Sequence, residues 1–184
     1  MLLYVQVIYM EKTKMYLSNA LLDLLKVKSF DDIKVTEICD KALIHKTTFY
    51  NHFEDKYELL NYVLLQMHND ITSNTKYDGS LIDYYLSVAK YYIKYIKNNP
   101  KLFKSIISND NTTGIILFEK LYIKDIQEKI AQNNIQEVPS NYAAHFYVSA
   151  VLAIISEWFI NGMAEDEDTL LNYITILVKK EKAF

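Results

Sequence analysis

Residues 35–56, V-T-E-I-C-D-K-A-L-I-H-K-T-T-F-Y-N-H-F-E-D-K, decide the fold of this chain. Apolar side chains recur at the spacing of one helical face over the first eight positions; they are Val35, Ile38, Cys39 and Ala42. After a break at 43–45, a second short segment over 46–52 places Phe49 and Phe53 four residues apart on its inner side. The pattern predicts two short helices joined by a tight turn.

The outer side of the second segment is dense in hydrogen-bonding side chains, namely Lys46, Thr47, Thr48, Tyr50 and His52. A helix this short is not stable in isolation, so it must be held by packing. A packed first helix followed by an exposed polar second helix is how a helix-turn-helix offers a recognition helix to the DNA major groove. We therefore expect sequence-specific binding to double-stranded DNA.

Residues 42–53, with T-F-Y-N-H-F at 48–53, resemble the signature of the tetracycline-repressor-like (TetR/AcrR) regulators. The resemblance extends back through 16–25 and forward through E-D-K-Y-E-L-L at 54–60, and it covers about residues 12–65. It implies an all-helical homodimer with an N-terminal DNA-binding domain and a C-terminal ligand-binding and dimerisation domain. The implied function is transcriptional regulation, as a ligand-responsive repressor.

A second resemblance concerns residues 156–163, S-E-W-F-I-N-G-M. They are similar to the late helix of a subgroup that includes the dihydroxyacetone-kinase operon activators. Those activators respond through a partner protein, which implies an alternative: a regulator or coactivator with a protein partner and no small-molecule effector. A closed, polar-lined cavity would favour the small molecule, and a filled core with an exposed apolar groove would favour the partner.

The chain departs from the resembled pattern at two positions. Leu43 stands in the turn where the family usually has glycine, so we expect a turn that needs no positive φ. His45 stands before the recognition helix where the family often has serine. Histidine is a poor N-cap, so we expect the start of that helix to fray when no DNA is bound.

The predicted DNA contacts fall into two groups. Thr47 and Thr48, near the start of the recognition helix, are expected to read bases together with Lys46. Tyr50, by its place in T-F-Y-N-H-F, resembles a phosphate contact, and Thr36 and Lys56 at the starts of their helices are expected to bind phosphate as well. His52 is compatible with either role.

The twenty basic residues of the chain are all lysine. Arginine makes the commonest bidentate contact to guanine, so this chain has to read DNA through other side chains and through DNA shape. Residues 10–56 carry eight lysines and eight acidic residues. Because such a balance gives no general attraction to phosphate, we expect affinity to depend on a homodimer bound to a near-palindromic operator.

Helical periodicity dominates the rest of the sequence, which has only three glycines and two prolines. We expect an all-α fold of about nine helices: a three-helix DNA-binding domain at 10–56, a linking helix at about 55–75, and a helical bundle at 76–184. The first helix is expected at about 11–27, with Met15, Leu22 and Leu25 facing inward. Later helices are expected at 81–98, 100–108, 113–133, 140–162 and 167–181.

The segment 146–159 is apolar nearly all round, which requires cover on two sides. We expect one side to contact a second copy of the chain, together with the final helix, in a four-helix dimer interface. The candidate dimerisation residues are Ile155, Trp158, Phe159, Leu171 and Ile174. The pattern leaves open whether Trp158 faces the partner or its own core.

The middle helices, roughly 81–133, are the expected place for an effector, although the ligand-binding residues are unknown. Apolar and tyrosine-rich composition there favours a small, mostly hydrophobic molecule, such as an aromatic one, held by a few hydroxyl groups. Lysines outnumber acidic residues in the region, so a neutral or anionic compound fits better than a cation. A region packed solid, which binds nothing, is the alternative.

The sequence contains no glycine-rich phosphate loop, nucleophile elbow or paired metal-ligand motif. We therefore expect neither an enzyme nor a cofactor or metal site, and we interpret His68 and His145 as ordinary helix residues. The single cysteine, Cys39, reads as a small buried hydrophobe, with a redox sensor as the alternative. Its isolation fits a reducing cytoplasm. Residues 1–9 are interpreted as a mis-assigned start or an extra ordered turn, and as neither a targeting nor a membrane segment.

Overall fold

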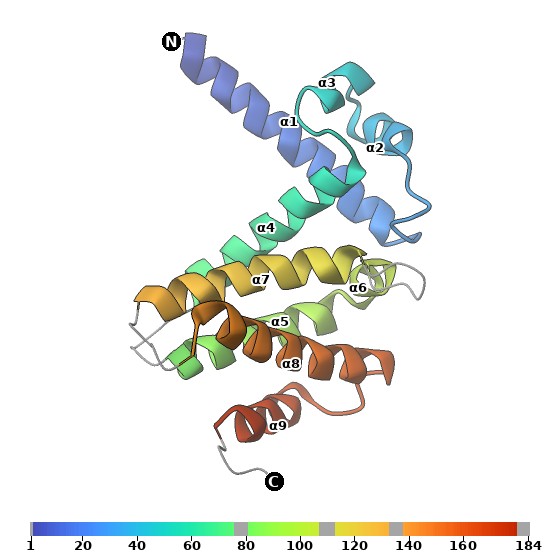
Figure 1. Cartoon of the computed structure of the whole chain (residues 1–184). Helices are drawn as coiled ribbons and strands as arrows, with labels where there is room; N and C mark the ends of the chain where they lie inside the picture. Colours follow the sequence, from blue (N-terminus) through green and yellow to red (C-terminus); the bar gives the residue numbers. More distant parts are fainter. Residues whose placement is uncertain (1, 76–80, 107–112, 133–137, 180–184) are drawn as a thin grey trace. The chain divides into compact units, whose positions relative to one another are not determined.

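The computed structural model describes residues 2–75, 81–106, 113–132 and 138–179. Within these ranges the chain forms helices and no strand (Figure 1). The helices are α1 (Leu2–Leu25), α2 (Val35–Ala42), α3 (Lys46–Tyr50), α4 (Lys56–Asn74), α5 (Leu81–Asn98), α6 (Pro100–Ile106), α7 (Thr113–Gln132), α8 (Ser140–Ile160) and α9 (Glu167–Lys179). The prediction of an all-α fold with about nine helices is confirmed.

The residues group into two compact units, and each is described by itself. Unit 1 comprises residues 1–66 with 100–117, and unit 2 comprises residues 67–99 with 118–184. Helix α6 thus belongs to the same unit as α1–α3. The domain boundary expected just before residue 81 falls mainly on 76–80, outside the described residues, so the division into domains 10–56 and 76–184 stays a prediction.

The first helix differs from the prediction in its length and in which of its side chains are buried. It begins at Leu2 and ends at Leu25, so residues 2–10 continue α1 as helix. Met15 is 49% exposed, and the expectation that it faces inward is wrong. The buried face is instead set by Leu17, Leu21 and Leu25, which follow one another at i+4 spacing and are fully buried. Leu22, expected to face inward, is half-buried.

The turn after α2 corrects a second expectation. Leu43 adopts φ 56°, ψ 40°, which is the left-handed region that an L-residue other than glycine seldom occupies. The reason lies in the hydrogen bonds that end α2: the Leu43 amide donates to the Asp40 carbonyl and the Ile44 amide to the Cys39 carbonyl. This pair of bonds is the Schellman motif, which requires a left-handed residue at that position.

Unit 2 is built around a core rich in tyrosine. Tyr84, Tyr85 and Tyr92 of α5 and Tyr122 of α7 are all at most 3% exposed. Pro139 directly precedes α8, as expected for a proline beside a helix start. The carbonyl of Pro139 accepts hydrogen bonds from the backbone amides of Tyr142 and Ala143 in α8. Helix α8 ends before Gly162, which adopts φ 81°.

Candidate DNA-binding site

Helix α3 has only five residues and is fixed to unit 1 through two phenylalanines. Phe49 is fully buried and Phe53 is 3% exposed. Their ring centroids lie 5.8 Å apart, and Tyr62 of α4 lies 5.6 Å from the ring of Phe53. The helix ends at Tyr50, sooner than expected, and is followed by a turn in which the amides of His52 and Phe53 both donate to the Phe49 carbonyl. Because one side of α3 is buried against unit 1, the opposite side faces solvent.

The polar face expected from the sequence is present on α3. Lys46 and Thr47 are exposed, Thr48 and His52 are half-buried, and Tyr50 is 56% exposed. The Tyr50 ring meets Phe49 edge-on at 5.3 Å, so its position is set by packing although most of its surface is accessible. Adjacent exposed amine, hydroxyl and phenol groups on one short helix are suited to contact base edges and phosphates.

The start of α3 has no side-chain cap, as expected from His45. His45 lies in the extended region at φ −67°, ψ 145°, and its imidazole makes no capping hydrogen bond. Its carbonyl still accepts the first helical bond, from the Phe49 amide. The expected fraying of this turn without DNA stays a prediction.

The start of α2, where Thr36 lies half-buried, is organised by Glu37. One Glu37 carboxylate oxygen accepts a hydrogen bond from the Lys34 amide at 2.9 Å, and the other accepts one from the Lys28 ammonium. These bonds, that from Lys28 above all, lower the pKa of Glu37. A carboxylate at this end also interacts favourably with the helix dipole.

Lys56 lies in an unexpected setting. Its ammonium donates hydrogen bonds to three carbonyl oxygens, those of Phe30 (2.9 Å), Asp31 (2.8 Å) and Ile33 (2.9 Å). It also lies 4.8 Å from the ring centroid of Phe30 and 5.6 Å from that of Tyr57. Burial lowers the pKa of Lys56. All three N–H donors are thus directed at carbonyl oxygens of the chain itself, and the phosphate contact expected of Lys56 stays a prediction.

The five candidate dimerisation residues divide into two groups. Ile155, Trp158 and Ile174 are at most 5% exposed within a single chain, and the Trp158 indole donates to the Glu165 carbonyl at 3.0 Å. Phe159 and Leu171 are half-buried. Trp158 therefore faces its own core. The large apolar side chains that remain exposed on α8 and α9 are others: Tyr142, Phe146, Ile160, Tyr173, Ile176 and Leu177.

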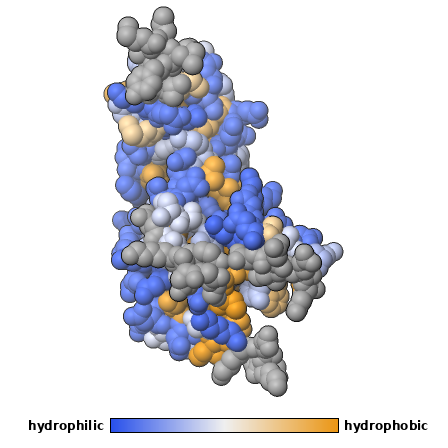
Figure 2. Space-filling view, turned by 90° about the vertical axis from the view of Figure 1, so that its left-hand side faces the viewer, coloured by the Kyte–Doolittle hydropathy of each residue, from blue (hydrophilic) through white to orange (hydrophobic). Residues whose placement is uncertain are grey.

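Helix α8 is long and apolar enough to cross a bilayer by length and composition alone. This property alone does not identify a membrane span, since the core helix of a soluble protein meets the same test. Figure 2 views the molecule from the left of Figure 1 and shows hydrophobic surface among hydrophilic residues on its lower part. The apolar character of α8 fits a helix that packs on the core of its own chain on one side and leaves its other side for contact with a partner chain.

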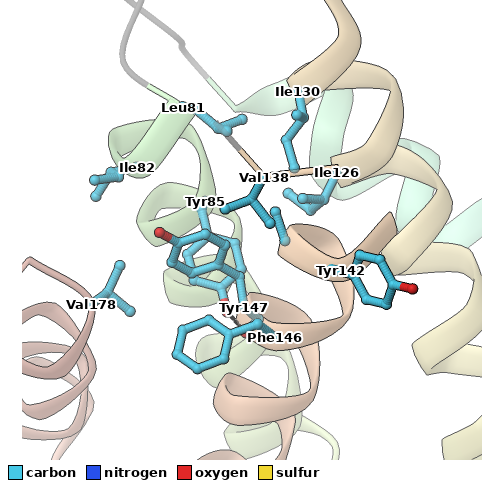
Figure 3. A pocket seen from close by; sticks show the side chains of 11 residues that line it. Leu81, Ile82, Tyr85, Ile126, Ile130, Val138, Tyr142, Phe146, Tyr147 and Val178 are labelled. Atoms are coloured by element: carbon cyan, nitrogen blue, oxygen red, sulfur yellow. Dashed lines mark hydrogen bonds between the residues drawn. The ribbon is translucent and has the colours of Figure 1, made fainter. Parts of the chain in front are cut away.

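Unit 2 contains a half-open apolar pocket of about 610 Å³. Its walls come from four helices and include Tyr85 of α5, Ile126 and Ile130 of α7, Tyr142 and Phe146 of α8, and Val178 of α9. Figure 3 shows Tyr85, Phe146 and Tyr147 grouped together, while the Tyr142 hydroxyl points away from them. The Tyr85 hydroxyl donates to the Tyr147 carbonyl. The wall is thus mainly hydrophobic.

Beside this pocket, the centre of unit 2 is filled by a polar aromatic cluster. His68 Nδ1 lies 2.8 Å from the Tyr92 hydroxyl, and the Tyr84 hydroxyl donates to Asp125 at 2.6 Å. The Tyr122 ring stacks on that of Tyr85 at 6.3 Å, and its hydroxyl is buried without a hydrogen-bond partner. Burial lowers the pKa of His68, although Asp125 opposes this. In the described part of the chain, no group of three His, Cys, Asp or Glu residues could hold a metal ion.

Comparisons with known proteins agree with this architecture. Residues 83–180 match the family model of a TetR-type transcriptional regulator C-terminal region. The transcriptional activator DhaS of the dhaKLM operon from Lactococcus lactis is 26% identical over 159 residues, which cover 82% of this chain and 81% of that protein.

Two solved structures share the fold. A TetR transcriptional regulator from Streptococcus agalactiae has a TM-score of 0.68 and 19% identity, with 96% of this chain and 99% of that one covered. A dihydroxyacetone kinase operon activator DhaS has a TM-score of 0.60 and 20% identity, with coverage of 90% and 93%. The residues that match the family model make up more than half of the chain. The chain therefore belongs to the TetR family of transcriptional regulators, which bind DNA and are not enzymes.

Proposed function

We propose that this regulator acts in the cytoplasm as a homodimeric repressor that binds a near-palindromic operator and releases it when an effector binds. The observation that carries the proposal is the exposure of Lys46, Thr47 and Tyr50 on a short helix whose other side is buried through Phe49. Two copies of α3 would enter successive major grooves, with half-sites about one DNA turn, roughly 34–36 Å, or a little more apart.

The proposed roles of the DNA-contacting residues are those expected from their places in the sequence, and their accessibility supports them. Lys46, Thr47 and Thr48 read bases, Tyr50 and Thr36 bind phosphate, and His52 is placed for either. Thr48 is half-buried and Thr47 exposed, so Thr47 reaches further from the helix surface. With no arginine in the chain, discrimination rests on threonine contacts, one lysine and DNA shape.

Selection of bound fragments from genomic DNA by the purified protein tests this function. We expect the recovered fragments to share one near-palindromic sequence, and the genes beside it to be those that are regulated. A variant with Lys46, Thr47 and Thr48 all replaced by alanine should recover no common sequence. A control with Lys94, an exposed lysine of α5, replaced by alanine should recover the wild-type sequence. Recovery of the same fragments by the triple variant would refute the assignment of α3.

The apolar pocket of unit 2 is the proposed effector site. Its volume of about 610 Å³ lies within the range of small-molecule sites, about 300–1,000 Å³. Its lining favours a hydrophobic, neutral or weakly acidic compound with an aromatic portion that stacks beside Tyr85 and Phe146. The pocket extends beyond the expected range of 81–133, because α8 and α9 also form its walls.

A thermal-shift screen with lipophilic neutral, acidic and cationic compounds tests the effector site. We expect neutral or acidic compounds to raise Tm and to release the selected operator. Replacing Ala143, which lines the pocket, by phenylalanine should abolish both effects. The same replacement at Ala164, which is exposed outside the pocket, should leave them unchanged. Stabilisation by cations only, or an unaltered response of the Ala143 variant, would contradict the proposal.

The alternative, a protein partner in place of the small molecule, has its own support. The centre of unit 2 is filled by aromatic side chains, and the apolar pocket is half-open. The 26% identical relative is named as an activator of the dhaKLM operon, which also leaves activation as an alternative to repression. Deleting the gene and measuring transcription of the selected neighbours decides this: transcription rises for a repressor and falls for an activator.

A further inference from the structure

The loop between α1 and α2 is held from two sides of unit 1. From α6, the Ser105 hydroxyl donates to the Leu25 carbonyl, and the Ser105 carbonyl accepts a bond from the Phe30 amide at 3.1 Å. From the start of α4, the Lys56 ammonium binds the carbonyls of Phe30, Asp31 and Ile33. Phe30 and Ile33 are themselves buried, at 4% and 1% exposure. The loop is therefore a fixed part of the unit.

This loop sets where α2 begins. Ile33, whose carbonyl binds Lys56, is followed by Lys34, whose amide donates to Glu37, and α2 starts at Val35. Thr36, the proposed phosphate contact of α2, lies three residues beyond Ile33. A displacement of the loop would move the first turn of α2, and with it the hydroxyl and amide of Thr36, away from the phosphate.

We propose that Lys56 is a positioning residue for DNA recognition, which fixes the α1–α2 loop and thereby the phosphate-contacting start of α2, and that it does not itself bind phosphate. The tetrahedral ammonium suits this task because it directs three donors toward three separate oxygens. A guanidinium carries its donors in a planar fork and cannot reproduce that arrangement. This inference rests on the proposed DNA contacts of α2 and α3.

The two roles predict opposite results for Lys56→Arg. A phosphate contact tolerates arginine, which binds phosphate well. A three-carbonyl clamp does not tolerate it. We expect Lys56→Arg to lower affinity for the selected operator about tenfold or more, and affinity for a mixed-sequence duplex to fall with it, because the displaced contact at Thr36 is to phosphate. Helical circular dichroism at the assay temperature, well below Tm, confirms that the variant is folded. A protein that is merely less stable, but folded at this temperature, would bind both duplexes as the wild type does.

The salt dependence of operator binding gives an independent readout. Each lysine that neutralises a phosphate adds about 0.9 to the slope of log K against log salt concentration. Lys56→Met should leave the slope unchanged, whereas Lys46→Met, on the exposed face of α3, should reduce it. If Lys56→Met does not fold, the hydrogen exchange of amides 32 and 33 in Lys56→Arg, expected to be faster than in wild type, takes its place.

The outcomes separate the two proposals. Wild-type affinity of Lys56→Arg, or a slope reduced by about 1.8 in Lys56→Met (about 0.9 for each of the two subunits), would overturn the positioning role. An unchanged slope and affinity in Lys46→Met would instead contradict the proposed contacts of α3, while a loss of affinity in folded Lys56→Arg would still support the positioning role.

Discussion

Leu43 carries a conformational strain that the chain tolerates without evident packing gain. It is 94% exposed at φ 56°, so its side chain contributes almost no burial. A left-handed L-residue costs about 1–2 kcal/mol, which replacement by glycine would remove. The greater conformational freedom of glycine in the unfolded chain would cancel about 0.4–1 kcal/mol of that gain in stability. We expect Leu43→Gly to raise the free energy of unfolding by about 0.5–1 kcal/mol. Leu43→Ala, which keeps a Cβ, should gain nothing. Urea denaturation measures both, and an equal effect of the two variants would argue against strain at this position.

Two small truncations on α3 distinguish base reading from phosphate binding. Tyr50→Phe removes one hydroxyl from a residue fixed by Phe49, so operator and mixed-sequence affinities should fall together. Thr48→Ala should instead change which base is preferred, at a cost of about 1–3 kcal/mol for the original base. Binding to a set of operators with one substituted base each, measured for both variants, checks this. Wild-type affinity and preference in both would remove these residues from the interface.

Single residues were predicted well where their role depends on local pattern. Cys39 lies on the inward stripe of α2 and is 2% exposed, as its spacing indicated. Leu43 was predicted wrongly, because the absence of glycine suggested an ordinary turn while the bonds that end α2 impose a left-handed one. The setting of Lys56 could not be read from sequence, since its carbonyl partners lie 23–26 residues away.

At the scale of helices, α5, α6 and α8 begin at the expected residues because prolines and breakers mark them. The prediction of which face of α1 is buried was wrong for Met15 instead. Its apolar residues Met15, Leu17, Leu21, Leu22 and Leu25 allow more than one stripe, and packing on α2 and α6 selects the one at 17, 21 and 25. A helix with apolar residues on several sides does not specify its own buried face.

His68 makes α4 and its contacts in unit 2 sensitive to pH. Its pKa is lowered by burial and raised again by Asp125, whose carboxylate lies 4.0 Å from Nε2; Tyr84, Tyr92 and Tyr122 complete the surroundings. Below the ordinary histidine pKa of about 6.5, the unfolded chain takes up a proton that the folded chain resists. Stability is therefore fully present above about pH 6.5 and is lost as pH falls from there toward the lowered pKa.

We expect urea midpoints to fall between pH 7 and pH 5 in the wild type, and to fall less in His68→Gln. Other titrating groups contribute to the same curve, so the difference between the two proteins is the measured quantity. His145→Gln, at an exposed position of α8, is the matched control and should follow the wild type. An identical pH dependence of His68→Gln and wild type would contradict the buried neutral state of His68.

For the whole molecule, the family and the all-α architecture followed from one motif and from helical periodicity, and both are confirmed. The surface proposed to face a second copy did not follow. Helix α8 is apolar nearly all round over 146–159, so its sequence does not say which side the protomer itself covers. The structure shows that Val148, Val151, Ile155 and Trp158 cover the inner side. What remains exposed on α8 includes the small residues Ala150 and Ala153, which allow close approach of a partner helix.

The dimer surface is accordingly proposed on the exposed sides of α8 and α9. A charge at Ile155 would be a poor test, since this residue is 5% exposed and its replacement would unfold the protomer. Glutamate at both Ala153 and Ile176 spares the core, because Ala153 is exposed and Ile176 is 40% exposed. An uncompensated charge at an interface costs about 3–5 kcal/mol, so the double variant should sediment as a folded monomer and lose the selected operator. Lys94→Glu, at an exposed position of α5, should remain dimeric. A wild type that is monomeric at micromolar concentration, or a double variant that still dimerises, would refute this surface, and the operator would then have to be read by another arrangement of α3.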